Sequence, residues 1–354
     1  MDLPTIWFLA VAVLWTGYLV LEGFDFGVGM LLRVLGRDSE DDREVALGAI
    51  GPVWDGNEVW LIAAVGAMFA AFPAWYGAMF SGFYLPVLLV LFGLIVRGVG
   101  LEYRHKRDDR TWRARWDAAI AVGSLAPAFV WGLVLANLVR GLPTTTSAPG
   151  PGRNTVVTAS VPDLFHGYAL LGGAVTTALF LLHGAVFLAL KTDGPVRYRA
   201  RRFALRAVVP VLGLTVAFLT ATLALRDPSW TTGVAWTSGL ALVAAGAALL
   251  LGREGWAFTA TATAVGALSV VVFGQLYPQL LVSTTDPAHT LTVANAASAP
   301  YTLTVMSWVA AVFLPLVLAY QAWSYWVFRR RLGGARVAPA GTDGPGAGAV
   351  TAPR

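Results

Sequence analysis

Two pairs of acidic residues are the part of this 354-residue sequence whose types and spacing could perform chemistry. Glu22 and Asp25 stand three residues apart in LEGFDFGVGM, and Asp55 and Glu58 stand three apart in GPVWDGNEVW. This spacing places both carboxylates of a pair on one face of a helix. Both pairs adjoin long apolar runs, where an ionisable group costs at least about 2.5–3.5 kcal/mol on insertion scales and is rare without a partner or a role.

Proton transfer is the chemistry that such acids could perform. The two apolar runs are joined by a short segment, so we expect adjacent helices and a cluster of four carboxylates. Clustered carboxylates cannot all stay ionised in a low-dielectric site, so at least one is expected to hold a proton. Groups that take up and release protons inside a membrane are what a proton path requires.

Asp55 is the acid for which a function is favoured most. Trp54, Asp55, Asn57 and Trp60 are crowded into one and a half turns of an otherwise apolar segment. For Glu22 and Glu58 an alternative stays open, in which the acids are solvated at the headgroup level or pair with basic side chains. The candidates for that pairing are Arg33, Arg97 and Arg104.

Glycines surround these acids. Gly23, Gly27 and Gly29 flank Asp25, and small residues allow either a neighbouring helix or a flat cofactor to approach the backbone. Simple helix packing is the more common of these two uses. The sequence therefore predicts close helix contacts near the acids, with a cofactor contact as the alternative.

The residues that would ligate a metal are scarce. The chain has no cysteine, which excludes disulfides, thiolate zinc sites and cysteine-ligated iron–sulfur clusters in it. Its four histidines offer no clear pair of axial haem ligands on facing helices. His183 is the one expected well inside a span, where a hydrogen-bonded core histidine is the common case. The others are His105 in a basic loop, His166 near an outer boundary and His289 in an outer loop.

Composition indicates that these residues belong to a membrane protein. Hydrophobic residues make up 57% of the chain and charged residues only 13%, about half of the roughly 25% usual in soluble domains. The net charge of +5 does not indicate nucleic-acid binding, because the basic residues lie in short loops between apolar runs, where membrane orientation explains them. The first apolar run has no basic leader and exceeds the length of a signal core, so we expect a retained span.

About nine segments are long and apolar enough to span a bilayer, which takes about 20 residues each. The sequence therefore predicts an all-α integral membrane protein with about nine transmembrane helices. A faint likeness between GYLVLEG and GYALLGG (17–23 and 167–173) suggests two four-helix units plus one peripheral helix. The expected spans are 5–32, 49–71, 76–97, 117–139, 164–190, 207–225, 234–251, 257–278 and 301–328.

The charges of the loops predict the orientation. Segments 97–116 and 191–206 and the start of the tail, Arg329 to Arg331, are dense in Arg and Lys, whereas 140–162 and 279–300 are not. Because positive loops are retained in the cytoplasm, we expect the N-terminus outside and the C-terminus inside. Residues 1–331 would form the membrane domain, and 332–354, rich in Gly, Pro and Ala, a disordered cytoplasmic tail.

Several motifs in the same order resemble those of cytochrome bd-type quinol oxidase subunit II. The resemblance is strong over about 1–140, weaker through the middle, and returns near 300–326. The segments that carry it are GFDFGVGM (23–30), PVWDGNEVWL (52–61), FSGFY (80–84), RGVGLEYR (97–104) and LTVMSW (303–308).

This resemblance implies a subunit of a quinol:oxygen oxidoreductase in the bacterial cytoplasmic membrane. The implied partner is a subunit I that bears the b- and d-type haems, oxidises quinol and reduces oxygen to water. Subunit II of this family holds no haem, assists assembly, and is associated with a proton route from the cytoplasm, here through Asp55, Asp25, Glu58 and Glu22. The resemblance also allows a quinone in this chain and a small accessory subunit. Candidates for a quinone- or partner-facing surface are Trp54, Trp60, Asn57 and Arg97.

Two other functions stay open from the residues alone. Intramembrane acids on Gly-broken helices would also suit a proton-coupled secondary transporter, which should act without a partner. A purely structural partner of a haem subunit is the second alternative, and it predicts that Asp55→Asn leaves turnover intact when assembly is normal. No nucleotide-binding loop and no Ser–His–Asp arrangement could be identified.

Overall fold

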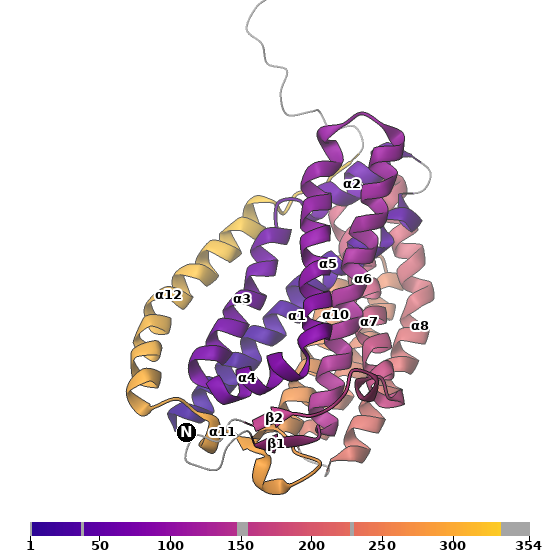
Figure 1. Cartoon of the computed structure of the whole chain (residues 1–354). Coiled ribbons are helices and arrows are strands. Elements are labelled where there is room, and N and C mark those ends of the chain that lie inside the picture. Colours follow the sequence, from indigo (N-terminus) through magenta and orange to yellow (C-terminus); the bar gives the residue numbers. More distant parts are fainter. Residues whose placement is uncertain (1, 37–38, 147–154, 227–229, 334–354) are drawn as a thin grey trace, which may run out of the picture.

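Long helices running between two ends of the molecule form the fold (Figure 1). A computed structural model describes residues 2–36, 39–146, 155–226 and 230–333. Among these residues, eight helices are long and apolar enough to cross a membrane, which confirms an all-α integral membrane protein. They are α1 (Leu3–Leu35), α5 (Tyr84–Tyr103), α6 (Arg110–Arg140), α7 (Gly167–Lys191), α8 (Gly194–Leu225), α9 (Thr231–Leu250), α10 (Glu254–Leu276) and α12 (Pro300–Val327).

The remaining predicted span corresponds to α3 (Trp54–Ala71). It has 18 residues and packs against α1, but its first turns carry Asp55, Asn57 and Glu58. With these polar side chains, α3 is not among the eight helices that are long and apolar enough to cross a membrane. The total of nine transmembrane helices therefore stays a prediction.

Two predicted spans begin later than expected because the chain breaks before each. Segment 49–71 contains a turn at 51–53, which separates α3 from α2 (Glu40–Ile50). The side chain of Ser39 caps α2 by accepting from the Asp42 amide. Segment 76–97 is broken at Phe83, between α4 (Pro73–Gly82) and α5, and Pro73 occupies the first helical position that proline favours.

Helix α1 occupies the centre and packs against α3, α6, α7 and α10. Its closest neighbour is α7, because the two backbones touch at Gly27 and Gly184. A Cβ atom at Gly27 would lie 1.9 Å from the Phe180 carbonyl oxygen, and one at Gly184 would lie 2.5 Å from the backbone of Gly27. Only glycine allows this approach, so helix packing, as expected, uses the glycines beside Asp25. The division into two four-helix units stays a prediction.

Helix α12 lies at the edge of the molecule (Figure 1). Only 6% of its most apolar stretch is buried, against 72% for α7, which agrees with the predicted peripheral helix. At one end, the Trp7 indole N–H of α1 is bonded to Ser307 of α12 at 3.1 Å. At the other, Gln321 and Tyr325 are bonded to Asn57 of α3.

Two small antiparallel hairpins, which the sequence did not predict, lie at the end of the molecule that holds the N-terminus (Figure 1). Thr285 joins them through its hydroxyl, which donates to the Thr144 carbonyl at 2.6 Å. The strands and remaining short helices are β1 (Thr144–Thr146), β2 (Thr155–Val157), β3 (Gln279–Leu281), β4 (Leu291–Thr292), η1 (Arg104–Lys106), η2 (Pro162–Leu164), η3 (Pro287–His289) and α11 (Val293–Ala296).

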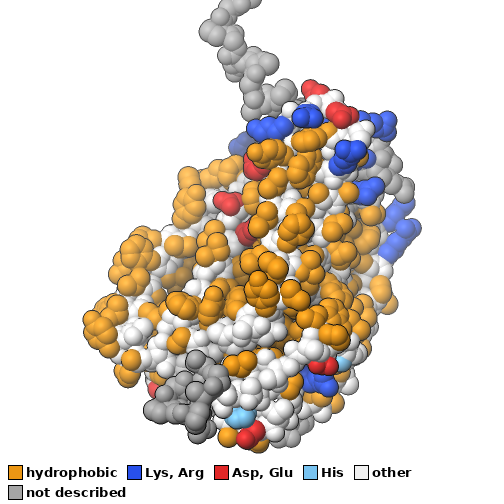
Figure 2. Space-filling view, in the orientation of Figure 1, with side chains coloured by type: hydrophobic (Ala, Val, Ile, Leu, Met, Phe, Trp, Pro, Cys, Tyr) orange, Lys and Arg blue, Asp and Glu red, His pale blue; other side chains and the backbone are white. Residues whose placement is uncertain are grey.

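Basic side chains gather at the opposite end, while apolar side chains cover the flank (Figure 2). We call this opposite end the basic end. The chain leaves α12 there, and Leu332 is bonded through its backbone to Lys191 and Asp193 at 2.8 Å each. Residues 334–354 lie outside the described part of the chain, so the predicted disordered tail at 332–354 stays a prediction.

Candidate functional site

A fully buried arginine on α5 holds the predicted acids together. The Arg97 side chain has 0% exposure, and its Nη1 atom donates to a carboxylate oxygen of Glu22 on α1. The same nitrogen lies 3.7 Å from a carboxylate oxygen of Glu58 on α3. Its guanidinium also lies over the Phe26 ring, 5.1 Å from the centroid, and 5.9 Å from that of Trp54. Pairing with Arg97, which the sequence left as an alternative, is therefore observed for Glu22.

Asp25 completes the cluster through a bridge to Asn57. The Asn57 side-chain amide donates to Asp25 Oδ2 at 2.7 Å. The Asn57 carbonyl oxygen accepts from the Tyr325 hydroxyl at 2.7 Å and from the Gln321 amide at 3.1 Å. We call Glu22, Asp25, Asn57, Glu58 and Arg97 the inner cluster.

Buried polar atoms of the inner cluster are incompletely paired. Nε and Nη2 of Arg97 find no hydrogen-bond acceptor among the described residues, and Oε2 of Glu22 and Oδ1 of Asp25 find no donor there. An unpaired buried polar group costs about 1–3 kcal/mol, and more when it is charged. The cluster thus combines three carboxylates and one guanidinium in an arrangement whose hydrogen bonds are only partly made.

Helix geometry places this cluster well away from the end of α1. Asp25 stands ten residues before the end of α1 at Leu35, or about 15 Å along the helix axis. Glu22 and Asp25 are one turn apart on α1, as their spacing predicted. Neither side chain is exposed at all, so neither is a solvated headgroup-level acid.

Asp55 is not a member of the inner cluster, so the expected cluster of four carboxylates contains only three. Asp55 is exposed, whereas the side chain of Asn57 is fully buried. Two residues correspond to about 200° of rotation on a helix, so burial of Asn57 turns Asp55 outward. Glu58 lies between these two directions and keeps 24% exposure. On α3, Glu58 is therefore intermediate between Asp55 and Asn57 both in direction and in exposure.

The candidates for a quinone- or partner-facing surface separate into two groups. Arg97 and Asn57 are fully buried within the chain, so neither side chain forms an outward-facing surface. Trp60 lies against Gly17, where an added Cβ would come within 2.2 Å of its ring. Trp60 borders a groove of about 810 Å³ between α1 and α10, lined mostly by apolar side chains. Trp54 lies against Gly98 and Arg97.

His183 in α7 and His166 at the start of that helix are both held by hydrogen bonds within the chain. Both nitrogens of the buried His183 ring are in hydrogen bonds, Nδ1 with Thr261 at 2.7 Å and Nε2 with the Val20 carbonyl at 3.2 Å. The predicted hydrogen-bonded core histidine is confirmed. His166 caps α7, as expected near a span boundary. No cluster of three or more His, Cys, Asp or Glu that could hold a metal occurs in the described ranges.

A second arginine of the same helix segment organises the basic end. Arg104 is also fully buried, and its three nitrogens donate to Asp117 at 2.6 Å, to Glu40 at 2.6 Å and to Glu44. We call these four residues the end cluster. Burial alone would raise the pKa of the Glu40 carboxyl, but the hydrogen bond and charge of Arg104 outweigh it and hold that pKa below its ordinary value. The sequence did not identify these acids as a group.

Known proteins resemble this chain over nearly its whole length. The family model described as cytochrome bd terminal oxidase subunit II matches residues 3–328. Cytochrome bd ubiquinol oxidase subunit 2 of Bacillus subtilis is 41% identical over 336 residues, 94% of this chain and 97% of the relative. Cytochrome bd-I ubiquinol oxidase subunit 2 of Escherichia coli K12 is 34% identical, over 91% and 93% of the two chains. A structure of bd oxidase from Geobacillus thermodenitrificans shares the fold, with a TM-score of 0.70 at 20% identity over 92% of this chain and 99% of the other.

Proposed function

The chain belongs to the cytochrome bd terminal oxidase subunit II family, and we propose that its inner cluster forms part of a proton path serving oxygen reduction. As a member of this family, it is a subunit of a quinol-oxidising oxidoreductase complex of the bacterial cytoplasmic membrane. Its partner is subunit I of that complex. The haems of the complex supply the electron transfer to oxygen, and the proposal assigns them to the partner.

The observation that carries the proposal is the under-paired Arg97 among three buried carboxylates. With Glu22, Asp25 and Glu58 all ionised, the cluster would have two negative charges in excess of the arginine. Such an excess is costly where water is excluded, so a proton on one carboxyl stabilises the cluster. Atoms with free hydrogen-bonding capacity let that proton move between carboxyl oxygens.

The exposure of the acids supports a direction for the path. It begins at the exposed Asp55, passes Glu58 one turn along α3, and reaches the buried Glu22 beside Arg97. The positive-inside rule makes the basic end cytoplasmic and puts the N-terminus outside. In this orientation, α1 and α3 carry their acids in the cytoplasmic half, from which protons for water formation would come.

Asp25 and Asn57 would contribute positioning in this proposal. The Asn57 amide group donates to Asp25 and accepts from Tyr325 and Gln321, so its orientation is fixed from both sides. An amide does not exchange protons as readily as a carboxyl group. Asn57 therefore holds Asp25 in place and closes the cluster toward α12.

The test is oxygen uptake and proton release by the complete complex in proteoliposomes. We expect Asp55→Asn and Glu58→Gln to lower both rates while the haem spectrum keeps its full intensity. Glu102→Gln is the matched control, because Glu102 is an exposed acid of α5 outside the inner cluster. Full activity of Asp55→Asn at full haem content would exclude Asp55 from the path, and loss of haem would indicate a role in assembly instead.

The same preparation tests the two other functions. A purely structural subunit would leave turnover unchanged in every acid variant that assembles. A proton-coupled transporter would move protons in liposomes that contain this chain without its partner. The match to the oxidase family over residues 3–328 favours the oxidase subunit over the transporter.

The groove beside Trp60 supports a place for a quinone in this chain. Its volume of about 810 Å³ falls in the usual range for small-molecule sites, roughly 300–1,000 Å³, and its apolar lining suits an isoprenoid tail. We expect Trp60→Leu to reduce the quinone that co-purifies with the complex. Trp236→Leu is the control, because Trp236 is an exposed tryptophan of α9 away from the groove. Equal quinone content in both variants would contradict this assignment.

A further inference from the structure

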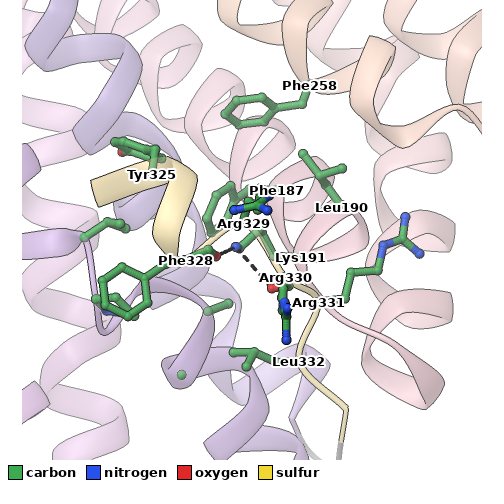
Figure 3. Close-up of a pocket in the computed structure, with 14 residues that line it drawn as sticks. Phe187, Leu190, Lys191, Phe258, Tyr325, Phe328, Arg329, Arg330, Arg331 and Leu332 are labelled. Atoms are coloured by element: carbon green, nitrogen blue, oxygen red, sulfur yellow. Dashed lines mark hydrogen bonds between the residues drawn. The ribbon is translucent and has the colours of Figure 1, made fainter. Parts of the chain in front are cut away.

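A cavity of about 300 Å³ opens at the basic end, between the ends of α7 and α12 (Figure 3). We call it the basic pocket. Its size is near the lower limit for small-molecule sites, so it can hold part of a larger ligand. Its inner wall is apolar. Its mouth carries four cationic side chains, three of them consecutive in the sequence. The wall includes Val53, Phe187, Leu190 and Phe258, and the mouth includes Lys191, Arg329, Arg330 and Arg331.

The positive charge at the mouth exceeds the negative charge around it. Arg331 lies 3.4 Å from Asp193 and 3.6 Å from Glu254, and Arg197 also pairs with Glu254 at 2.8 Å. Two carboxylates, those of Asp193 and Glu254, therefore face five cationic side chains. The five are the four cations of the mouth and Arg197. Arg330 has no carboxylate partner in the part of the chain that the structure describes. The mouth therefore has unneutralised positive charge.

The cations of the mouth are held in place by the fold. Lys191, the last residue of α7, donates to the Phe328 and Arg330 carbonyl oxygens at the end of α12. The Arg329 guanidinium stacks on Trp326, 4.4 Å from the ring centroid. These contacts fix the backbone that carries Arg330. The positions of the cations at the mouth are therefore set by the fold.

The level of the pocket in the membrane indicates the kind of occupant. α7 ends at Lys191 and α12 ends at Val327, so the mouth lies where spanning helices emerge and where Lys and Arg heads reach lipid phosphates. An apolar wall directly below a cationic mouth matches a molecule with an acyl chain and a negative headgroup. The same features oppose entry of hydrated cations, because positive charge repels them and the wall offers them few acceptors.

We propose that the basic pocket binds an anionic phospholipid of the adjoining leaflet. Its phosphate lies among Arg329, Arg330 and Arg331, and the first part of an acyl chain lies against Phe187, Leu190 and Phe258. This site is separate from the proton path, although Tyr325 lines the pocket and is bonded to Asn57 of the inner cluster. The inference therefore stands whether or not the acids move protons.

The experiment counts lipids bound to the complete oxidase complex. The complex is reconstituted in nanodiscs of equal parts phosphatidylglycerol and phosphatidylcholine, and lipids retained after transfer to detergent are identified by native mass spectrometry. One basic residue near a membrane surface contributes about a fivefold factor in affinity for anionic lipid. We expect Arg330→Gln to lower phosphatidylglycerol retention by about fivefold. Arg202→Gln, which removes an exposed arginine of α8 outside the pocket, should leave retention unchanged.

A second variant tests the apolar wall. Leu190→Trp fills the cavity without changing its charge, and we expect it to lower phosphatidylglycerol retention while haem absorbance stays constant. Equal loss in Arg330→Gln and Arg202→Gln would overturn the proposal, since it would reduce the effect to general surface charge. Full retention in Leu190→Trp, with displacement of the lipid by inorganic phosphate, would also overturn it and leave a phosphate site only.

Discussion

The inner cluster and the end cluster are built from the same parts on the same stretch of chain. Arg97 and Arg104 are seven residues apart, both are fully buried, and each is surrounded by three acids. Arg104 uses all three of its nitrogens, whereas Arg97 leaves Nε and Nη2 without acceptors among the described residues. The two clusters therefore differ in how completely the central arginine is paired.

This difference separates a structural ion network from one suited to proton movement. A buried pair with every hydrogen bond made resists rearrangement, and breaking it costs about 3–5 kcal/mol. A buried cluster with free lone pairs and donors can change its protonation with little movement of atoms. The comparison predicts that damage to the end cluster reduces stability and that damage to the inner cluster reduces turnover.

Arg104→Gln should have the largest effect. It leaves Asp117 buried without its main partner, so we expect the complex to lose about 3 kcal/mol of stability, measured as a lower unfolding temperature. Arg113→Gln is the control, because Arg113 pairs mainly with Asp108, whose side chain is 96% exposed, and such pairs contribute about 0–1 kcal/mol. Similar unfolding temperatures for the two variants would show that the end cluster does not stabilise the fold as proposed.

Glu22→Gln and Glu44→Gln form a matched pair across the two clusters. Each replaces a carboxylate that accepts from the central arginine with an amide that cannot carry a proton. We expect Glu22→Gln to lower oxygen uptake by about a hundredfold at full haem content, the usual lower bound for losing a proton-transfer group. Glu44→Gln should keep turnover within about twofold of the parent. A large loss of oxygen uptake in Glu44→Gln, with little change in Glu22→Gln, would assign proton transfer to the end cluster and a structural role to the inner cluster.

Glu40 gives the end cluster a pH dependence. Because its folded-state pKa is below the ordinary value of 4.5, the stability it contributes is complete above that value and is lost as pH falls through the folded-state pKa. We expect the unfolding temperatures of the parent and Glu40→Gln to differ at about pH 7 and to converge as pH falls from 4.5 through the lowered folded-state pKa of Glu40. A difference that stays constant over this range would contradict the assigned pairing with Arg104.

Tyr325→Phe should have the smallest effect. It removes one hydrogen bond to Asn57 and leaves the one from Gln321, so we expect a loss of about 1 kcal/mol in stability and little change in oxygen uptake. Tyr320→Phe is the control, because Tyr320 is 66% exposed on the same helix. A large loss of turnover in Tyr325→Phe would contradict this expectation and would indicate that the Tyr325 hydroxyl takes part in proton transfer.

The fold could be predicted from the sequence where span length and apolar content decide it. Long apolar runs identified most helices, and the resemblance to subunit II motifs identified the family. The breaks before α3 and α5 were missed because the flanking residues are as apolar as the helices themselves. Gly51 and Pro52 in the turn before α3, and Gly82 at the end of α4, were the local signals that could have revealed them. The hairpins were missed because their strands have only two or three residues.

The site could be predicted only as far as helix periodicity determines it. The spacing of Glu22 and Asp25 correctly placed both on one buried face. The outward direction of Asp55 depends on how α3 is rotated against α1, which its sequence alone does not determine. Gln321 and Tyr325 were missed because they lie more than 260 residues from Asn57 in the chain. Their contact depends on where the last helix packs.

The peripheral position of α12 has a consequence for biosynthesis. Chains emerge from the ribosome N-terminus first, and α12 is the last described helix. Since so little of it is buried, the helices before it can insert and pack while it is still being translated. Asn57 gains its bonds to Gln321 and Tyr325 only afterwards. Arrival of the final helix therefore marks the moment at which a newly made subunit closes the inner cluster.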